Sequence, residues 1–141
     1  MSDIRIEGWS QEDFDQLIQS ARRAISLAIK YTATEVWGNI REEAPVDHGR
    51  LAGSFQLDQV DDLSYRIWSG VEYATAVHEG TAPRIIEPRN KRALYWDGAR
   101  HPVRRVMHPG TPGNPYAERA IEQASNRSDE FISRALREVG L

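Results

Sequence analysis

The distribution of proline is the feature that most constrains this chain. Six of its seven prolines lie within residues 73–116, at positions 83, 88, 102, 109, 112 and 115. Proline fixes φ and removes a backbone donor, so this stretch can form neither a long helix nor a central strand. Short extended pieces separated by turns fit it better. A connection this long is uncommon in a compact domain unless it has a function.

A long helix is predicted before this stretch. Ser10 and Asp13 fit a capping box, and Trp9 and Phe14 fit a hydrophobic staple. Pro45 disfavours helix at the preceding residue, so the helix is expected to end near Glu43. About 33 residues would span about 50 Å, more than the width of so small a domain. We therefore expect part of this helix to overhang and meet a neighbour, unless it breaks near residues 32–34.

Shorter elements and a second helix are predicted along the rest of the chain. Strand-like runs cover residues 54–60 and 64–71, joined by a loop at 61–63, and residues 73–79 read as one or two helical turns. Further extended pieces are expected at 85–86, 93–96 and 103–107. Asn114 and Pro115 begin a helix that is expected to reach about Val139 and to end at Gly140. Tyr116, Ala120, Ile121 and Ala124 are expected to pack under the sheet against the first helix.

These elements predict an α+β fold. We expect a single domain over residues 1–141, in which a long N-terminal helix and a C-terminal helix pack on an antiparallel sheet, with a long proline-rich irregular segment. The chain has no cysteine, which excludes disulfides and thiolate metal sites. No apolar run approaches the roughly 20 residues of a membrane span, and the N-terminus lacks the apolar core of a signal peptide. We therefore expect assembly in the cytosol, without a membrane.

Positive charge is concentrated in residues 84–105. The chain carries a net charge of −3, yet this segment holds seven basic residues against two acidic ones. One reading is a solvated loop; the other is a docking surface for an acidic partner. The candidate interface residues are Arg84, Arg89, Lys91, Arg92, Arg100, Arg104 and Arg105.

No catalytic or cofactor motif is recognisable. His78-Glu79 is not followed by a second histidine at helical spacing, so the zinc-protease pattern fails. Ser54 and Ser69 do not lie in a Gly-x-Ser-x-Gly turn. The four histidines are expected to hydrogen-bond locally in loops. We expect no catalytic residue, cofactor or metal; a small hydrolase using His78 and Glu79 is a minor alternative.

A set of residues is instead expected to shape turns. Gly80 and Gly110 each precede a threonine and are expected at positive φ, where valine would cost about 1 to 3 kcal/mol. Asp47 can bond the backbone ahead of it, and Gly49 is free to take positive φ. The full set of structural turn residues is Pro45, Asp47, Gly49, Gly80, Thr81, Pro109, Gly110, Thr111 and Pro115.

Four sequence blocks carry a resemblance to a known family. They are Ala-Pro-Val-Asp-His-Gly-Arg-Leu-Ala-Gly-Ser (44–54), Tyr-Ala-Thr-Ala-Val-His-Glu-Gly-Thr (73–81), Ile-Glu-Pro-Arg-Asn with Ala-Leu (86–90, 93–94), and His-Pro-Gly-Thr with Asn-Pro-Tyr (108–111, 114–116). In this order the blocks resemble those of the tail-completion proteins, also called head-to-tail joining or neck proteins, of long-tailed bacteriophages, prophages and gene-transfer agents. His48 departs from the usual threonine, and Tyr116 from the usual phenylalanine.

The resemblance implies a non-enzymatic structural protein of the virion, a minor tail component. Family members are thought to form a ring, commonly hexameric, at the head–tail junction, with DNA passing through the lumen without sequence specificity. The implied partners are further copies of the chain, a head connector or stopper protein, and a tail-terminator or tail-tube protein. A closed ring needs two different faces on each subunit. The alternative is a nucleic-acid-binding module using residues 84–105 and Trp96, although such modules are usually basic overall.

Overall fold

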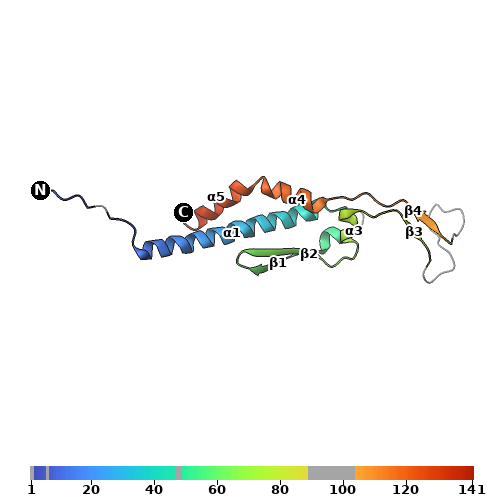
Figure 1. Cartoon of the computed structure of the whole chain (residues 1–141), viewed down its shortest axis with the longest axis horizontal. Helices are drawn as coiled ribbons and strands as arrows, with labels where there is room; N and C mark the ends of the chain where they lie inside the picture. Colours follow the sequence, from blue (N-terminus) through green and yellow to red (C-terminus); the bar gives the residue numbers. More distant parts are fainter. Residues whose placement is uncertain (1, 6, 47–48, 89–103) are drawn as a thin grey trace. The chain divides into compact units, whose positions relative to one another are not determined.

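The computed structural model describes residues 2–5, 7–46, 49–88 and 104–141 (Figure 1). It has an α+β fold, as predicted: a long N-terminal helix, two small antiparallel sheets and C-terminal helices. Contacts divide the chain into two compact units, taken one at a time below. Unit 1 comprises Met1–Gly70 with Ala117–Leu141, and unit 2 comprises Val71–Tyr116. The expectation of a single domain stays a prediction.

The first helix, α1 (Gln11–Glu43), is confirmed with both of its predicted ends. The Asp13 amide donates to Ser10 Oγ over 3.1 Å, and the Ser10 amide donates to the Asp13 carboxylate over 2.9 Å. The rings of Trp9 and Phe14 lie 5.6 Å apart, as a staple requires. The helix does not break near residues 32–34, where the Thr32 and Thr34 hydroxyls donate to carbonyls one turn back.

Unit 1 is built around α1. Helices α4 (Tyr116–Ser125) and α5 (Ser128–Glu138) run along one side of it, and the hairpin of β1 (Phe55–Asp61) and β2 (Ser64–Ser69) runs along another (Figure 1). The short helix α2 (Arg50–Ser54), where the prediction left a loop, precedes the hairpin. Small side chains dominate the core, which consists of Ala24, Ile40, Ala44, Leu51, Ala120, Ala124, Phe131 and Ala135.

The prediction of one continuous C-terminal helix is wrong, because the helix is interrupted between α4 and α5. At the interruption the Arg127 amide bonds the Ala124 carbonyl three residues back, with φ −106° at Arg127. The polar run Ser-Asn-Arg-Ser at 125–128 favours this, since short polar side chains compete for backbone groups; the Ser128 hydroxyl donates to the Ser125 carbonyl. Gly140, at φ 81°, follows the end of α5 as expected.

The predicted burial of the C-terminal stripe is only partly confirmed. Tyr116, Ala120 and Ala124 are buried, but Ile121 is 52% exposed. The reason is helical geometry: Ala120 and Ala124 lie four residues apart on one face, whereas Ile121 is turned about 100° from Ala120. Tyr116 bonds the Ala74 carbonyl and meets the His78 ring, both in unit 2; its predicted packing against the first helix stays a prediction.

Unit 2 contains one short helix and one two-stranded ribbon. Helix α3 (Ala74–Glu79) ends at Gly80, as predicted, and the Gly80 amide bonds the Ala76 carbonyl over 2.8 Å. Strands β3 (Arg84–Ile86) and β4 (Val106–His108) pair antiparallel in a register that opposes Ile85 and Met107. The extended piece expected at 85–86 is present, and the one expected at 103–107 is confirmed only for its last two residues, since β4 begins at Val106. The one at 93–96 lies outside the described residues.

Candidate functional site

A backbone clasp closes the base of the ribbon in unit 2. We call Gly80, Thr81, Gly110 and Thr111 the Gly-Thr clasp. The amides of Thr81 and Thr111 each donate to the other's carbonyl, over 2.9 and 3.0 Å, and the Thr111 amide also reaches Thr81 Oγ1. Two turns separated by about thirty residues of sequence are thereby joined by main-chain bonds, which fixes where the ribbon starts.

Glycine is required twice in this clasp. Gly80 has φ 82° and Gly110 has φ 85°, as predicted, and L side chains rarely adopt such backbone conformations. Space gives a second reason, because a Cβ on Gly80 would lie 2.5 Å from the Thr111 carbonyl oxygen, and one on Gly110 would overlap the Thr81 oxygen. Each glycine thus lets the backbone of the opposite turn approach.

Tyr116 anchors the C-terminal end of unit 2 to helix α3. Its side chain is buried, and its hydroxyl donates to the Ala74 carbonyl over 3.1 Å. Burial raises the pKa of the Tyr116 phenol. The His78 ring meets the Tyr116 ring edge-on at 5.1 Å. The two blocks of sequence around residues 73–81 and 108–116 therefore form one framework, since the Asn114 amide also bonds the Val77 carbonyl.

The ribbon exposes an apolar pair on one face. Directly opposed residues of an antiparallel pair share a face, so Ile85 and Met107 point to one side, whereas Ile86 and Val106 point to the other. Ile85 is 50% exposed and Met107 62% exposed, while Ile86 and Val106 are half-buried. A two-stranded ribbon is at best marginally stable alone in water. This face is therefore suited to being covered by another surface.

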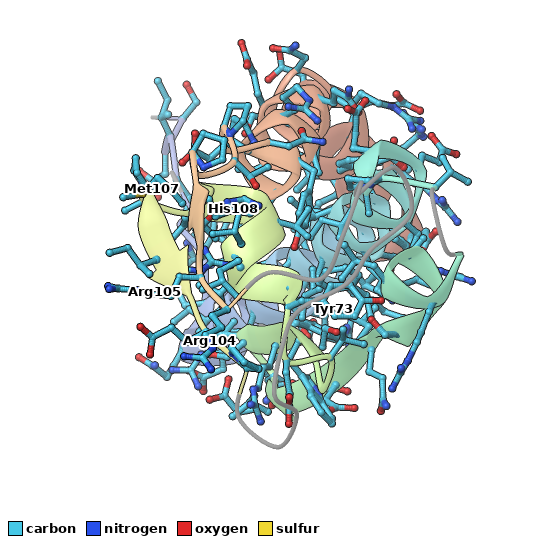
Figure 2. All side chains as sticks on the ribbon, turned by 90° about the vertical axis from the view of Figure 1, so that its right-hand side faces the viewer. Tyr73, Arg104, Arg105, Met107 and His108 are labelled. Atoms are coloured by element: carbon cyan, nitrogen blue, oxygen red, sulfur yellow. The ribbon has the colours of Figure 1, made fainter. Side chains whose placement is uncertain are left out.

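Cations are neighbours of the apolar pair along the chain, although Arg84, which opposes His108, shares the other face with Ile86 and Val106. Figure 2 labels Arg104, Arg105, Met107 and His108 on the β4 side of the ribbon. Arg105 pairs with Glu87 over 2.9 Å, and both side chains are more than half exposed, so this pair contributes roughly 0 to 1 kcal/mol. Arg84 and Arg104 are exposed and form no ion pair with any residue in the described ranges. Of the predicted interface residues, Arg89, Lys91, Arg92 and Arg100 lie outside the described residues.

The concentration of charge in the sequence pointed to the cations, and no pattern pointed to the Ile85–Met107 pair. The pairing itself was not readable, because twenty-one residues separate Ile85 from Met107 and no turn sequence fixes their register. The site that emerges is therefore mixed: an apolar centre with basic neighbours.

The remaining turn residues lie as follows. Pro45 follows Ala44, whose ψ of 141° takes the chain out of α1, and Gly49 has the expected positive φ of 61° at the start of α2. Asp47 lies outside the described residues. Pro109 follows His108, whose Nδ1 accepts from the Gly110 amide over 3.0 Å, a local bond of the predicted kind. Pro115, which was expected at the first helical position, immediately precedes α4, so the helix begins one residue later than expected, at Tyr116.

His78 has a buried Nε2 atom with no hydrogen-bond partner among the described residues. In the described ranges no three His, Asp or Glu side chains gather as a metal site would require. The helices that are described include none that is both long and apolar enough to cross a bilayer.

Comparisons with known proteins add no identification. No protein-family model, curated protein or solved structure matches this chain.

Proposed function

We propose that this chain is a structural protein of the head–tail junction in a long-tailed bacteriophage, prophage or gene-transfer agent. In this proposal identical copies form a ring, most commonly of six, that completes the tail or joins it to the head connector. DNA passes through the lumen without sequence specificity. The protein acts by binding its neighbours and carries out no reaction.

The observation that carries the proposal is the junction of two of the four resembling blocks. The blocks at 73–81 and 108–116 meet through the Gly-Thr clasp, the Asn114–Val77 bond and the Tyr116–Ala74 bond. These two blocks are thus the ones that position the ribbon. This supports a common architecture, since unrelated blocks would have no reason to form one framework.

The ribbon is the surface that we assign to a neighbouring protein of the head connector, stopper, tail terminator or tail tube. Exposed Ile85 and Met107 suit a protein surface, because apolar burial contributes to protein association and gains little from a phosphate backbone. Arg84 and Arg104 would meet acidic side chains of that neighbour. A strongly cationic lumen would also retard DNA that must pass quickly, which further favours a protein target.

The test is a joining assay in the particle that carries the protein. Without the chain, we expect filled heads and separate tails in electron micrographs, and expression of the wild-type chain should restore joined particles. Arg84→Glu combined with Arg104→Glu should leave the fold intact, because exposed changes usually alter stability by no more than about 0.5 kcal/mol each. Joined particles should nevertheless decrease at least tenfold. The triple change Arg89→Glu, Lys91→Glu and Arg92→Glu is expected to act likewise.

Arg137→Glu is the control for reversing an exposed charge outside the ribbon, since Arg137 is exposed on α5 in unit 1; this single reversal changes the net charge half as much as the double variant does. It should join heads and tails normally. Normal joining by the ribbon variants would contradict the assignment of the ribbon, and normal joining without the chain would contradict the proposed function itself.

The nucleic-acid alternative makes a different prediction for the same variants. If the cations bind DNA, the purified wild-type chain should bind arbitrary duplex with an affinity that falls steeply with salt. The ribbon variants should lose that affinity. Binding of this kind would move the assignment of residues 84–105 from protein to DNA.

A further inference from the structure

An apolar seam runs along one face of α1. Successive residues of the seam lie alternately four and three positions apart in the sequence. This is the pattern of a helix that packs against another helix. In the N-terminal part of the seam the large side chains are open to solvent: Phe14 is 49% exposed, Ile18 51% and Ile25 52%. The seam consists of Phe14, Ile18, Ala21, Ile25, Ala28 and Thr32.

The polar contacts between α5 and α1 lie beside this seam. Arg127 at the start of α5 pairs with Glu35 over 2.7 Å, and Glu138 at its end accepts from the Tyr31 hydroxyl. With 100° of turn per residue, Tyr31 and Glu35 lie roughly 60° to 100° around α1 from the centre of the seam. The large seam side chains Phe14, Ile18 and Ile25 thus remain open to solvent, whereas Ala28 and Thr32 are half-buried.

The C-terminal part of the seam is the floor of a groove. The groove has a volume of about 590 Å³ and lies between the hairpin and α5 within unit 1. Its floor contains Ala28 and Thr32, which leave room above the helix. The lining is mainly apolar and consists of Ile25, Ala28, Ile29, Thr32 and Ala33 of α1, Leu63 and Tyr65 of the hairpin, and Ser128 and Ile132 of α5.

The two parts of the seam complement each other in size. Phe14 and Ile18 are large and four residues apart; Ala28 and Thr32 are small and also four residues apart. A helix carrying the first pair can therefore place both side chains over the second pair, whichever direction it runs. Such matching of large to small across a helix pair is how interfaces reach close packing.

We propose that the N-terminal part of α1 from one copy, with Phe14 and Ile18 as anchors, docks into the α1–hairpin–α5 groove of a second copy. Donor and acceptor are different surfaces, so the contact is heterologous and can continue from copy to copy. The docking itself follows from the seam and the groove. Only the closure of successive contacts into a ring rests on the proposed function.

The area available indicates a weak contact between any two copies. Trp9 and Phe14 each expose on the order of 100 Å², about half of an aromatic side chain. With Ile18 and Leu17 the donor offers a few hundred Å², less than the roughly 800 Å² per partner of a stable complex. A single pair should therefore dissociate in dilute solution, whereas a closed ring, in which each copy makes two contacts, is stabilised by effective concentration.

Cross-linking identifies the surfaces that meet. The chain has no cysteine, so Ile18→Cys in one sample and Ala28→Cys in another can be mixed and treated with a short bis-maleimide. We expect the 18–28 cross-link between copies to exceed, by about tenfold, that from Gln16→Cys mixed with Ala28→Cys. Gln16 is the matched control because it is exposed two residues away, on the opposite side of α1.

Equal yields from the Ile18 and Gln16 samples would overturn the proposal. A dominant cross-link between two Ile18→Cys copies would also overturn it, since that result means a symmetric pairing of seams instead of donor and groove.

Sedimentation over a concentration series that reaches the millimolar range gives the second measurement. The wild-type chain should self-associate, and Phe14→Glu should weaken association about 30-fold, as the loss of an interface anchor does. Gln16→Glu should leave it unchanged, and circular dichroism should show that both variants keep their helices. A wild-type chain that stays monomeric throughout would mean that another protein, or none, covers the seam. The joining assay is independent of these results, so the docking and the junction function can fail separately.

Discussion

The contacts inside unit 1 differ in kind from the contacts inside unit 2. In unit 1, α1 is joined to α4 and α5 by side chains: Arg119 pairs with Glu43 over 2.8 Å, and Arg127 bridges Glu35 and Glu130. The core beneath these pairs is mostly alanine. In unit 2 the principal connections are main-chain bonds across the Gly-Thr clasp. Unit 1 is therefore sensitive to charge and side-chain volume, whereas unit 2 is sensitive to where a Cβ can be placed.

This difference also separates the two proposed surfaces. The seam and groove of unit 1 use exposed apolar side chains on a rigid helix, which suits binding to another copy. The ribbon of unit 2 places Ile85, Met107 and nearby cations on a framework fixed by backbone geometry. A substitution that weakens one surface should leave the other intact, so each unit can be tested separately.

The largest effect is expected from Gly80→Val. The positive φ alone costs about 1 to 3 kcal/mol, and overlap of the new Cβ with the Thr111 carbonyl should raise the loss in stability of unit 2 to about 4 kcal/mol. Hydrogen exchange followed by mass spectrometry should show lost protection at Thr81 and Thr111, with protection in α1 unchanged. Gly140→Val is the control, since Gly140 has the same sign of φ but open space. Equal losses of stability from the Gly80 and Gly140 variants would show that overlap with the Thr111 carbonyl adds nothing to the cost of positive φ.

The next effect concerns the aromatic anchor of unit 2. Tyr116→Ala should destabilise by about 3 kcal/mol, because it empties a buried site. Tyr116→Phe keeps the ring and removes only the bond to the Ala74 carbonyl, so it should cost about 1 kcal/mol. Urea unfolding of the two variants measures the loss in the free energy of unfolding caused by each change. A phenylalanine variant as unstable as the alanine variant would show that the hydroxyl, not the ring, holds unit 2.

Acid should affect unit 1 before unit 2. The hydrogen bonds from Arg119 and Gln123 lower the pKa of Glu43. The hydrogen bond from Arg127 lowers the pKa of Glu130, and the one from Tyr31 lowers the pKa of Glu138. A carboxyl group with a lowered folded-state pKa stabilises the fold above its unfolded value of 4.5, and that contribution is lost as pH falls through the folded value. Thermal unfolding of the helical signal should therefore shift to lower temperature below about pH 4.5.

Alkaline pH should affect both units, in contrast to acid, which should affect unit 1 first. The hydrogen bond to Glu138 raises the pKa of Tyr31 in unit 1, and burial raises the pKa of Tyr116 in unit 2. A raised folded-state pKa gives stability that is present below the unfolded value of 10.0 and is lost as pH rises through the folded value. Hydrogen exchange that showed unit 2 opening first in acid would contradict the comparison.

The smallest effect is expected from Glu87→Gln. It removes the ion pair with Arg105 on the exposed ribbon, where solvent screens the charges, so the change in stability should stay within about 0.5 kcal/mol. The same change makes the ribbon more basic. Urea unfolding should thus show no difference, and a loss above about 1 kcal/mol would mean that this pair is part of the framework of unit 2.

Local chemistry made several elements readable from the sequence. Ser10 and Asp13 specified the start of α1, and Pro45 specified its end, because caps and proline act on the backbone beside them. Gly80 and Gly110 could be assigned positive φ from their turn blocks alone. These predictions succeeded because each depends on interactions spanning only a few residues.

Tertiary structure decided what depends on residues far apart in the chain. The interruption between α4 and α5 follows from polar residues at 125–128 and from Arg127 reaching Glu35 on α1, a partner 92 residues away. The pairing of Ile85 with Met107 and the overlap at Gly80 arise from segments that meet only in the folded unit. Periodicity marks an apolar face on a helix, but it cannot say which part of that face is covered. The spacing of the seam residues is helical in the sequence, whereas only the positions of α5 and the hairpin determined that the first half of the seam is exposed and its second half forms a groove.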